Sequence, residues 1–218
     1  MLRRNICNEA GARSDGLMFV SVLFISAFTY IAITTNPVYT GIGVGDRAPE
    51  LVGDVWDGSS WTEFDLHKSL DENANLEIPV ETYYMIEFMD TNCGYCQQSA
   101  EQFLTPEQSK WTGDNPTRSM PENVKVEFLA VSIALHDGTE GWDYGKSEIT
   151  SFREEYGHTF NYMDDQDNDN RDEWGIPGTP TYFLVSPEGI ILYSTPDAEH
   201  GYTVWDAMDY EIPTGGEQ

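Results

Sequence analysis

The sequence is poor in basic residues: its 218 residues include 11 Lys and Arg against 38 Asp and Glu, a formal net charge of −27. Such an acidic surface repels phosphates, which argues against nucleic acid as a partner. Cysteine is also scarce, and three cysteines are too few for the disulfide framework of a small secreted protein. The 39% hydrophobic content is still enough for the packed core of one domain.

Long apolar runs are absent except for one near the N-terminus. Residues 17–33 carry no charge, and at ~1.5 Å per residue a helix over them is ~25 Å long, just short of a bilayer core. Arginines precede this run and the next follows only at Arg47, which by the positive-inside rule places the bulk of the chain outside the cytoplasm. We therefore expect a cytoplasmic segment over 1–16 and a transmembrane signal-anchor over 17–35. A cleaved signal that releases a secreted domain is the alternative, and a buried core helix is a third reading.

The rest of the chain divides into a linker over 36–45, a domain over 46–213 and a tail over 214–218. Within the domain, strand and helix signals alternate. In chain order we expect a strand over Tyr83–Met89, a helix over Cys96–Trp111 that Pro106 kinks or ends, a strand over Val124–Ile133, a helix over Ser147–Tyr156, a hairpin of Thr181–Val185 with Ile190–Tyr193, and a helix over Thr203–Tyr210. This order predicts an α/β fold with a mixed central sheet and helices on both faces.

The most informative motif is Cys93-Gly94-Tyr95-Cys96. It follows a predicted central strand and opens a predicted helix, whose free amides favour the thiolate of Cys93 and lower its pKa, while Cys96 lies one turn further in. Cysteines at this spacing can close a disulfide and exchange it through a mixed disulfide. We therefore expect Cys93 to be the nucleophile and Cys96 the resolving thiol of a thiol-disulfide oxidoreductase.

Three separated blocks carry a resemblance to a known family. They are Gly45-Asp46-Arg47-Ala48-Pro49 with Gly58, the segment Ile86–Cys96, and Gly175-Ile176-Pro177-Gly178-Thr179-Pro180-Thr181. Together they resemble the thioredoxin-like superfamily, and most of all its membrane-anchored, TlpA-like thiol-disulfide oxidoreductases of the redoxin type. The resemblance implies a three-layer thioredoxin-like fold, a redox-active disulfide with no dissociable cofactor, a role in redox homeostasis, and two kinds of partner: protein thiol or disulfide substrates and an electron-transfer protein.

The same resemblance assigns roles to further residues. Pro180 is expected to follow a cis peptide bond from Thr179 and to face the disulfide, where Thr179, Pro180, Gly94 and Tyr95 would bind substrate. Glu87 stands where thioredoxins carry a buried acid. An isolated carboxylate in a central strand has a raised pKa, which suits a group that accepts the proton of Cys96. A glutamate that reaches solvent at the strand end is the alternative.

Two other functions stay open at this stage. The Gly-Tyr dipeptide together with Thr179 resembles exported disulfide isomerases, and the cysteine pair could instead hold a soft metal ion in a binding or interaction module. We expect no metal site, because a structural zinc ion would need two more Cys or His ligands nearby. Asp165, Asp167 and Asp169 alternate like the start of a calcium loop, but position twelve of that loop is Ile176 instead of glutamate, which excludes an EF-hand.

Overall fold

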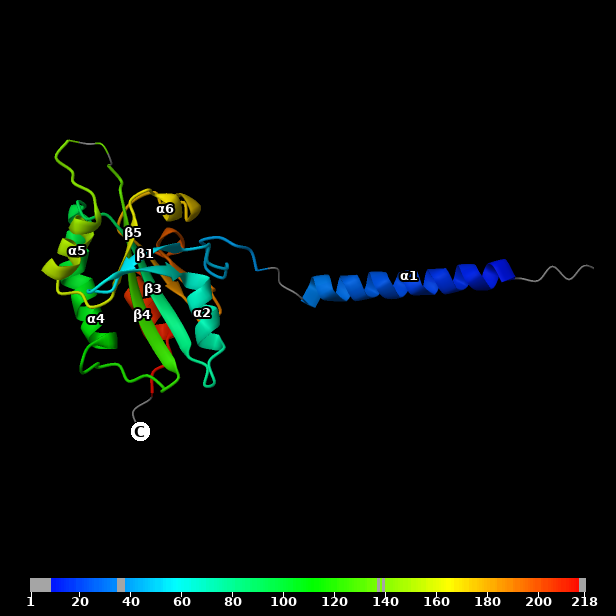
Figure 1. The fold of residues 1–218 in the computed structure, drawn as a ribbon. Coiled ribbons are helices and arrows are strands. Elements are labelled where there is room, and N and C mark those ends of the chain that lie inside the picture. The colour runs from blue at the N-terminus through cyan, green and yellow to red at the C-terminus, as the bar shows by residue number, and fades with distance from the viewer. Residues whose placement is uncertain (1–8, 35–37, 137, 139, 216–218) are drawn as a thin grey trace, which may run out of the picture. The chain divides into compact units, whose positions relative to one another are not determined.

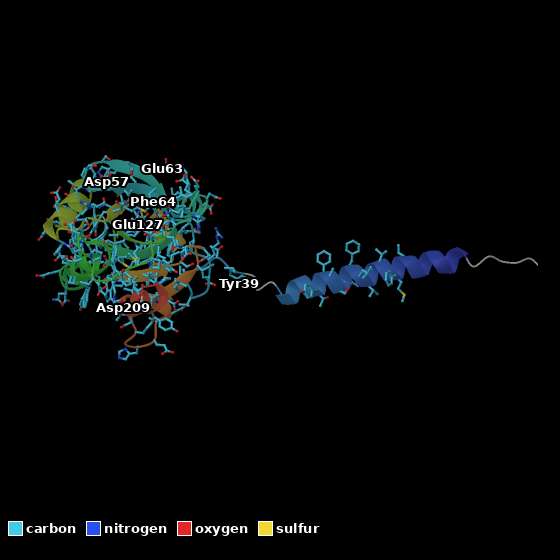
Figure 2. The ribbon with its side chains drawn as sticks, turned by 90° about the horizontal axis from the view of Figure 1, so that it is seen from below. Tyr39, Asp57, Glu63, Phe64, Glu127 and Asp209 are labelled. Carbon is cyan, nitrogen blue, oxygen red and sulfur yellow. The ribbon has the colours of Figure 1, made fainter. Side chains whose placement is uncertain are left out.

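The computed structural model describes residues 9–34, 38–136, 138 and 140–215, with the side chains of 9–16 and 31–34 left out. The chain divides into two compact units, Met1–Val38 and Tyr39–Gln218. The first unit holds helix α1 (Glu9–Thr34), and Figure 2 draws side chains along it. Apolar residues of this helix, such as Phe24 and Phe28, are exposed. Among the residues described, no helix combines the length and apolarity that a membrane crossing needs. The transmembrane helix expected over 17–35 is therefore not supported.

The second unit is built on a seven-stranded sheet in the order β2-β1-β5-β4-β3-β6-β7 (Figure 1). The strands are β1 (Val52–Trp56), β2 (Trp61–Asp65), β3 (Glu81–Met89), β4 (Val124–Ile133), β5 (Asn161–Asp165), β6 (Thr181–Val185) and β7 (Ile191–Ser194). Strand β4 pairs in parallel with β3 and β5, while the other neighbours are antiparallel. The predicted mixed sheet is confirmed.

Helices cover both faces of this sheet, as expected. They are α2 (Leu66–Ala74), α3 (Gly94–Ser99), the π-helical segment η1 (Ala100–Leu104), α4 (Thr105–Thr112), α5 (Lys146–Glu155), α6 (Asp169–Glu173), the 3-10 turn η2 (Thr195–Asp197) and α7 (Val204–Glu211). Figure 1 places α4 and α5 on one side of the strands and α2 on the other. In the Cys93–Cys96 motif, Cys93 immediately precedes α3 and the other three residues form its first turn.

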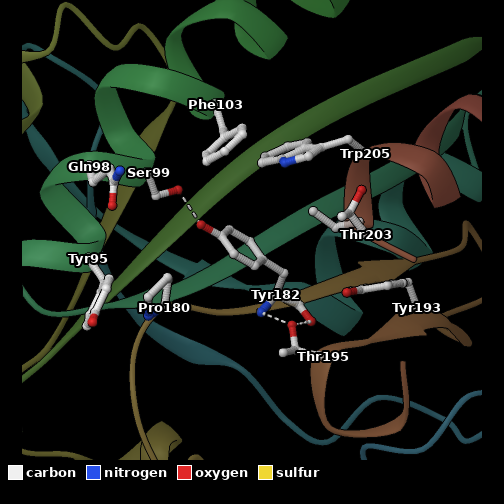
Figure 3. Close-up of a pocket in the computed structure, with 11 residues that line it drawn as sticks. Tyr95, Gln98, Ser99, Phe103, Pro180, Tyr182, Tyr193, Thr195, Thr203 and Trp205 are labelled. Carbon is white, nitrogen blue, oxygen red and sulfur yellow. Dashed lines mark hydrogen bonds between the residues drawn. The ribbon is translucent and has the colours of Figure 1, made fainter. Parts of the chain in front are cut away.

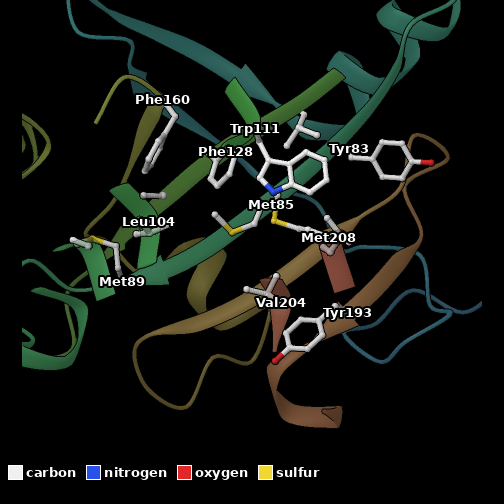
Figure 4. Close-up of a cluster of buried hydrophobic side chains, with 14 of the residues drawn as sticks. Tyr83, Met85, Met89, Leu104, Trp111, Phe128, Phe160, Tyr193, Val204 and Met208 are labelled. Carbon is white, nitrogen blue, oxygen red and sulfur yellow. The ribbon is translucent and has the colours of Figure 1, made fainter. Parts of the chain in front are cut away.

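Strand β3 separates two hydrophobic cores because its side chains alternate between the faces. Met85 and Met89 pack into the core that α3, α4, α5 and α7 cover, together with Trp111 (Figure 4). Ile86 and Phe88 pack into the opposite core under α2. By the same alternation Glu87 faces the first core, on the side of the sheet where α3 lies.

The helix expected over Cys96–Trp111 is interrupted. The amide of Thr105 donates to the carbonyl of Ala100, five residues back, so the chain widens into η1 before α4 begins. Pro106 has no N–H to continue the ladder, and the Thr105 side chain adds a second hydrogen bond to the Ala100 oxygen at 2.9 Å. The sequence predicted that the helix would kink or end at Pro106, whereas the π-helical segment η1 lies one turn before Pro106.

The start of the second unit is tied to the sheet. Residue 35 of the expected signal-anchor and residues 36–37 of the predicted linker lie outside the described residues, but from Tyr39 onward the backbone makes hydrogen bonds. The amide of Arg47 donates to Tyr39 at 2.8 Å and that of Gly45 donates to Ile191 in β7 at 2.8 Å. These bonds join the segment before Asp46 to the edge of the sheet.

Candidate active site

The two cysteines stand at the start of α3. Cys93 has extended backbone angles and is the residue that precedes the first helical turn, and its carbonyl accepts from the amide of Gln97 at 3.0 Å. Cys96 follows within that turn. Cys93 is half-buried and Cys96 is buried, and both are free thiols in this structure. The motif therefore lies where the sequence predicted it, between a central strand and a helix.

The loop before β6 faces Cys93. The Cys93 thiol lies 3.6 Å from the carbonyl oxygen of Thr179, and the Thr179-Pro180 peptide bond is cis, as the resemblance implied. The Thr179 hydroxyl is buried and has no hydrogen-bond partner within the described part of the chain. The structure thus brings together Cys93, Thr179 and Pro180, three of the residues proposed from the sequence.

The Cys96 thiol is held in its protonated form. Its side chain is 1% exposed, and burial raises its pKa, with the nearby carboxyl of Glu87 raising it further. Contacts with Thr179 and with the backbone of Asp90 act in the opposite direction but do not reverse the shift. Because only a thiolate attacks a disulfide efficiently, Cys96 needs a base before it can react.

Glu87 is the side chain whose carboxylate can serve as this base for Cys96. It is 1% exposed, so the alternative of a solvated strand-end glutamate is wrong. Burial raises its pKa to about 8, against the lowering effect of hydrogen bonds from Tyr182 and Ser99. The Tyr182 hydroxyl donates to Glu87 Oε1 at 2.9 Å. Near neutral pH such a carboxyl exchanges protons readily, which is what a general acid or base requires.

Asp90 fixes the loop that carries Cys93. Its carboxylate is fully buried and accepts three hydrogen bonds, from the amide of Asn92 at 2.8 Å, the amide of Leu135 at 3.0 Å and the hydroxyl of Tyr144 at 2.8 Å. Two of the three donors, Leu135 and Tyr144, are distant in the sequence, and no local pattern indicates their contact with Asp90.

A cavity of about 370 Å³ opens beside the motif (Figure 3). Five of its eleven lining residues are aromatic, and α3, η1, β6, β7 and α7 all contribute to its wall, which includes Tyr95, Phe103, Pro180, Tyr182 and Trp205. Tyr95 is 75% exposed, so the cavity reaches the surface. The sequence identified Tyr95 and Pro180 but missed Phe103, Tyr182 and Trp205, because these residues meet only through the tertiary fold.

Gly94 lies at the first helical position and lines no part of this cavity; a Cβ built there would contact nothing within 4 Å. Close approach of another chain is therefore sterically possible at Gly94. In the described residues, no cluster of three or more His, Cys, Asp or Glu side chains could hold a metal ion.

In the acidic segment at the end of β5, Asp165 binds the backbone of the following helix, α6. Asp165 is buried and its carboxylate accepts from the amides of Asn170 and Arg171, both at 2.8 Å. Asn168, which precedes α6, has a φ of 64°. The side chain of Asp165 thus holds the first turn of α6.

The mixed sheet, the cis-proline loop and the cysteine pair at a helix start define a thioredoxin-like α/β domain. Two solved structures share this fold. The thioredoxin domain of a thiol-disulfide oxidoreductase from Bacteroides vulgatus superposes with a TM-score of 0.52 at 18% identity, over 79% of this chain and 100% of that one. A hypothetical protein from Sinorhizobium meliloti gives a TM-score of 0.54 at 18% identity, over 82% and 91%.

Sequence comparison identifies the family. A family model described as a thioredoxin-like domain matches residues 79–210, which include β3, the cysteine motif, Glu87 and the cis-proline loop. No curated protein matches the chain. The chain belongs to the family of thioredoxin-like domains.

Proposed function

We propose that the protein is a thiol-disulfide oxidoreductase that exchanges disulfides with other proteins through Cys93 and Cys96. The observation that carries the proposal is the asymmetry of the pair. Cys93 is half-buried and faces the backbone of Thr179, whereas Cys96 is buried behind it with a raised pKa. A domain of the same fold from Bacteroides vulgatus is described as a thiol-disulfide oxidoreductase.

The first step is attack on a client. The Cys93 thiolate attacks one sulfur of the client disulfide, and a mixed disulfide forms as the client's other sulfur leaves as a thiolate. The electrons come from the cysteine pair itself, so no dissociable cofactor is required.

The second step releases the client. Cys96 attacks the Cys93 sulfur and the Cys93–Cys96 disulfide forms. The client sulfur that was bound to Cys93 leaves as a thiolate. The Cys96 proton passes to the carboxylate of Glu87, whose pKa of about 8 suits proton exchange near neutral pH. In the opposite direction, which oxidises a client, Glu87 returns the proton to Cys96.

Client binding would use the surface around the pair. The carbonyl of Thr179 lies beside Cys93, where an extended client segment could pair with the backbone of the loop. The adjacent aromatic cavity would take an apolar side chain next to the client cysteine. Gly94 leaves room for the client backbone to approach.

The location of the reaction is also part of the proposal. The arginines before the apolar run, with no further Lys or Arg until Arg47, favour a domain outside the cytoplasm, where disulfides persist. We propose that α1 anchors the full chain to a membrane through its exposed apolar side chains, although no described helix meets the requirements for a crossing. Carbonate extraction of membranes with the full chain, followed by protease protection, tests both anchoring and sidedness. Complete release by carbonate without cleavage would contradict the anchor.

The activity itself is tested by turnover of a protein disulfide. The reduced full chain is mixed with insulin in the presence of a thiol regenerant, and insulin thiols are counted over time. We expect catalysis that Cys93→Ser abolishes. Equal rates for this variant and the unmodified chain would contradict the proposal.

A further inference from the structure

Glu87 has no exposed surface through which to exchange its proton. It is 1% exposed, on the face of β3 that the helices cover. The titratable groups that interact electrostatically with it are Cys96 of α3, Tyr162 of β5 and Tyr182 of β6. At pH 7 a carboxyl with a pKa of about 8 is mostly protonated, so Glu87 must lose that proton to solvent before it can accept the proton of Cys96.

Hydroxyl groups connect this carboxyl to the aromatic cavity. The Tyr182 hydroxyl donates to Glu87 Oε1 at 2.9 Å and is also hydrogen-bonded to Ser99 Oγ. Ser99 and Tyr182 both line the cavity of about 370 Å³. In Figure 3 the Tyr182 ring extends from β6 with its hydroxyl directed at Ser99 of α3. The chain of groups is therefore continuous from the buried carboxyl to a cavity that reaches the surface.

We propose that Tyr182 and Ser99 form a proton relay that carries protons between the carboxyl of Glu87 and water in the cavity. This proposal rests on the proposed function, in which Glu87 accepts the proton of Cys96. Tyr182 and Ser99 would be relay residues, since neither is required to touch the reacting sulfurs. The relay also explains why a buried tyrosine hydroxyl lies between a carboxyl and a serine.

The relay conserves protons at each step. Before release of the client, the protonated carboxyl of Glu87 gives its proton to the Tyr182 oxygen, Tyr182 passes its own proton to Ser99, and Ser99 passes one to water in the cavity. The resulting carboxylate accepts the proton of Cys96 as the Cys93–Cys96 bond forms. Both hydroxyls then rotate back, and the sequence repeats in the next cycle.

The test separates attack from release in a single turnover. The reduced full chain is mixed in stopped flow with excess of a fluorescent peptide that contains one disulfide. Attack gives a phase whose rate depends on peptide concentration, and release gives a phase that does not. The variants are Tyr182→Phe and Ser99→Ala. Tyr84→Phe is the matched control, because the Tyr84 hydroxyl is also hydrogen-bonded to a serine, Ser69, at 2.6 Å, but neither residue lines the cavity.

We expect the two relay variants to split the release phase at pH 7. Molecules whose Glu87 is already ionised release peptide at the normal rate, while the rest wait for slow proton loss and react at least tenfold more slowly. At pH 9.5, where the carboxyl is ionised in most molecules, release should match that of the unmodified chain. Attack by the two relay variants should match attack by the unmodified chain at each pH, and Tyr84→Phe should behave as the unmodified chain in both phases.

Other outcomes overturn the proposal in distinguishable ways. A single release phase that is slowed equally at pH 7 and 9.5 indicates a structural defect. A single release phase whose pH dependence is shifted to another pH indicates an altered pKa of Glu87. Either result overturns the relay. Normal release in both relay variants, together with slow release in Glu87→Gln, overturns the relay but leaves the role of Glu87 intact. Normal release in Glu87→Gln, or the absence of any attack phase, defeats the proposed function itself.

Discussion

The thiol of Cys93 lies 3.6 Å from the carbonyl oxygen of Thr179. This contact joins the start of α3 to the cis-proline loop, two segments far apart in the sequence. A client strand that pairs with the loop backbone would bring its own sulfur to Cys93. Cys96, in contrast, is buried. The order of the two reactions follows from this difference in access.

Trapping tests that order. Cys96→Ser removes the thiol that resolves the mixed disulfide, so we expect the variant to accumulate covalent complexes with clients that reductant dissolves. Cys93→Ser removes the accessible nucleophile and should trap none. The measurement is non-reducing electrophoresis with mass spectrometry of the captured proteins. Equal trapping by both variants would reverse the roles of the two cysteines.

Glu87 should destabilise the fold as pH rises. Its pKa is raised from 4.5 to about 8 in the folded state by burial, so between these values the folded protein binds more protons than the unfolded chain. Stability from this group is full below pH 4.5 and is lost as pH rises through 8. At ~1.4 kcal/mol per pH unit, the loss between pH 5 and 9 is on the order of 4 kcal/mol.

Glu87→Gln removes this dependence. Gln keeps an oxygen that can accept from Tyr182 but does not ionise. We expect the variant to equal the unmodified chain near pH 5 and to exceed it in unfolding free energy at pH 9, as measured by urea denaturation. A constant difference between the two proteins at all pH values would show that Glu87 is not the group responsible.

His158 should act in the opposite direction at lower pH. It is 3% exposed, its Nδ1 is 2.6 Å from the Tyr162 hydroxyl and its Nε2 is 3.1 Å from Thr105 Oγ1. Burial lowers its pKa from 6.5 to about 4, so the unfolded chain binds the extra proton between these values. Its contribution is full above pH 6.5 and is lost as pH falls through 4.

We predict that the unfolding free energy of His158→Gln changes less between pH 7.5 and 4.5 than that of the unmodified chain. The advantage of the unmodified chain in unfolding free energy should shrink by about 2 to 3 kcal/mol between pH 7.5 and 4.5. The measurement is denaturant unfolding of both proteins at each pH. Parallel profiles would contradict a buried, neutral His158.

The aromatic cavity should govern the affinity for clients. Phe103 lines it and is 48% exposed, so Phe103→Ala removes contact area with little cost to the core. For a peptide with an aromatic residue beside its disulfide, we expect KM to rise about tenfold, equivalent to ~1.4 kcal/mol, with kcat unchanged. Tyr210→Ala, at a residue that is 81% exposed and outside the cavity, should change neither. A fall in kcat alone would contradict a binding role.

Much of the fold could be predicted because its signals are local. Val124–Ile133 and Thr181–Val185 form strands with the predicted bounds, since each is a dense run of apolar residues between turn signals. The short strands β1 and β5 were not predicted individually. Strand β1 (VGDVW) contains a glycine and an aspartate, and β5 (NYMDD) ends in acidic residues, so neither has a clear apolar period.

The site was predictable only in part, for a similar reason. Cys93, Cys96, Glu87 and Pro180 stand in recognisable motifs, and the structure brings them to one place. Tyr182, by contrast, looks like an ordinary strand residue in the sequence. Its contact with Glu87 depends on the antiparallel register of β6 against β3, in which the two residues are direct partners. Such cross-strand pairs cannot be read from one segment alone.

The most direct test of the central claim is a redox titration of the full chain in glutathione buffers, read by thiol alkylation and peptide mapping. We predict one two-electron transition in which Cys93 and Cys96 change together, with a potential between about −270 mV, typical of a reductant, and about −120 mV, typical of an oxidant. Independent titration of the two thiols, with no disulfide between them at any potential, would contradict the claim.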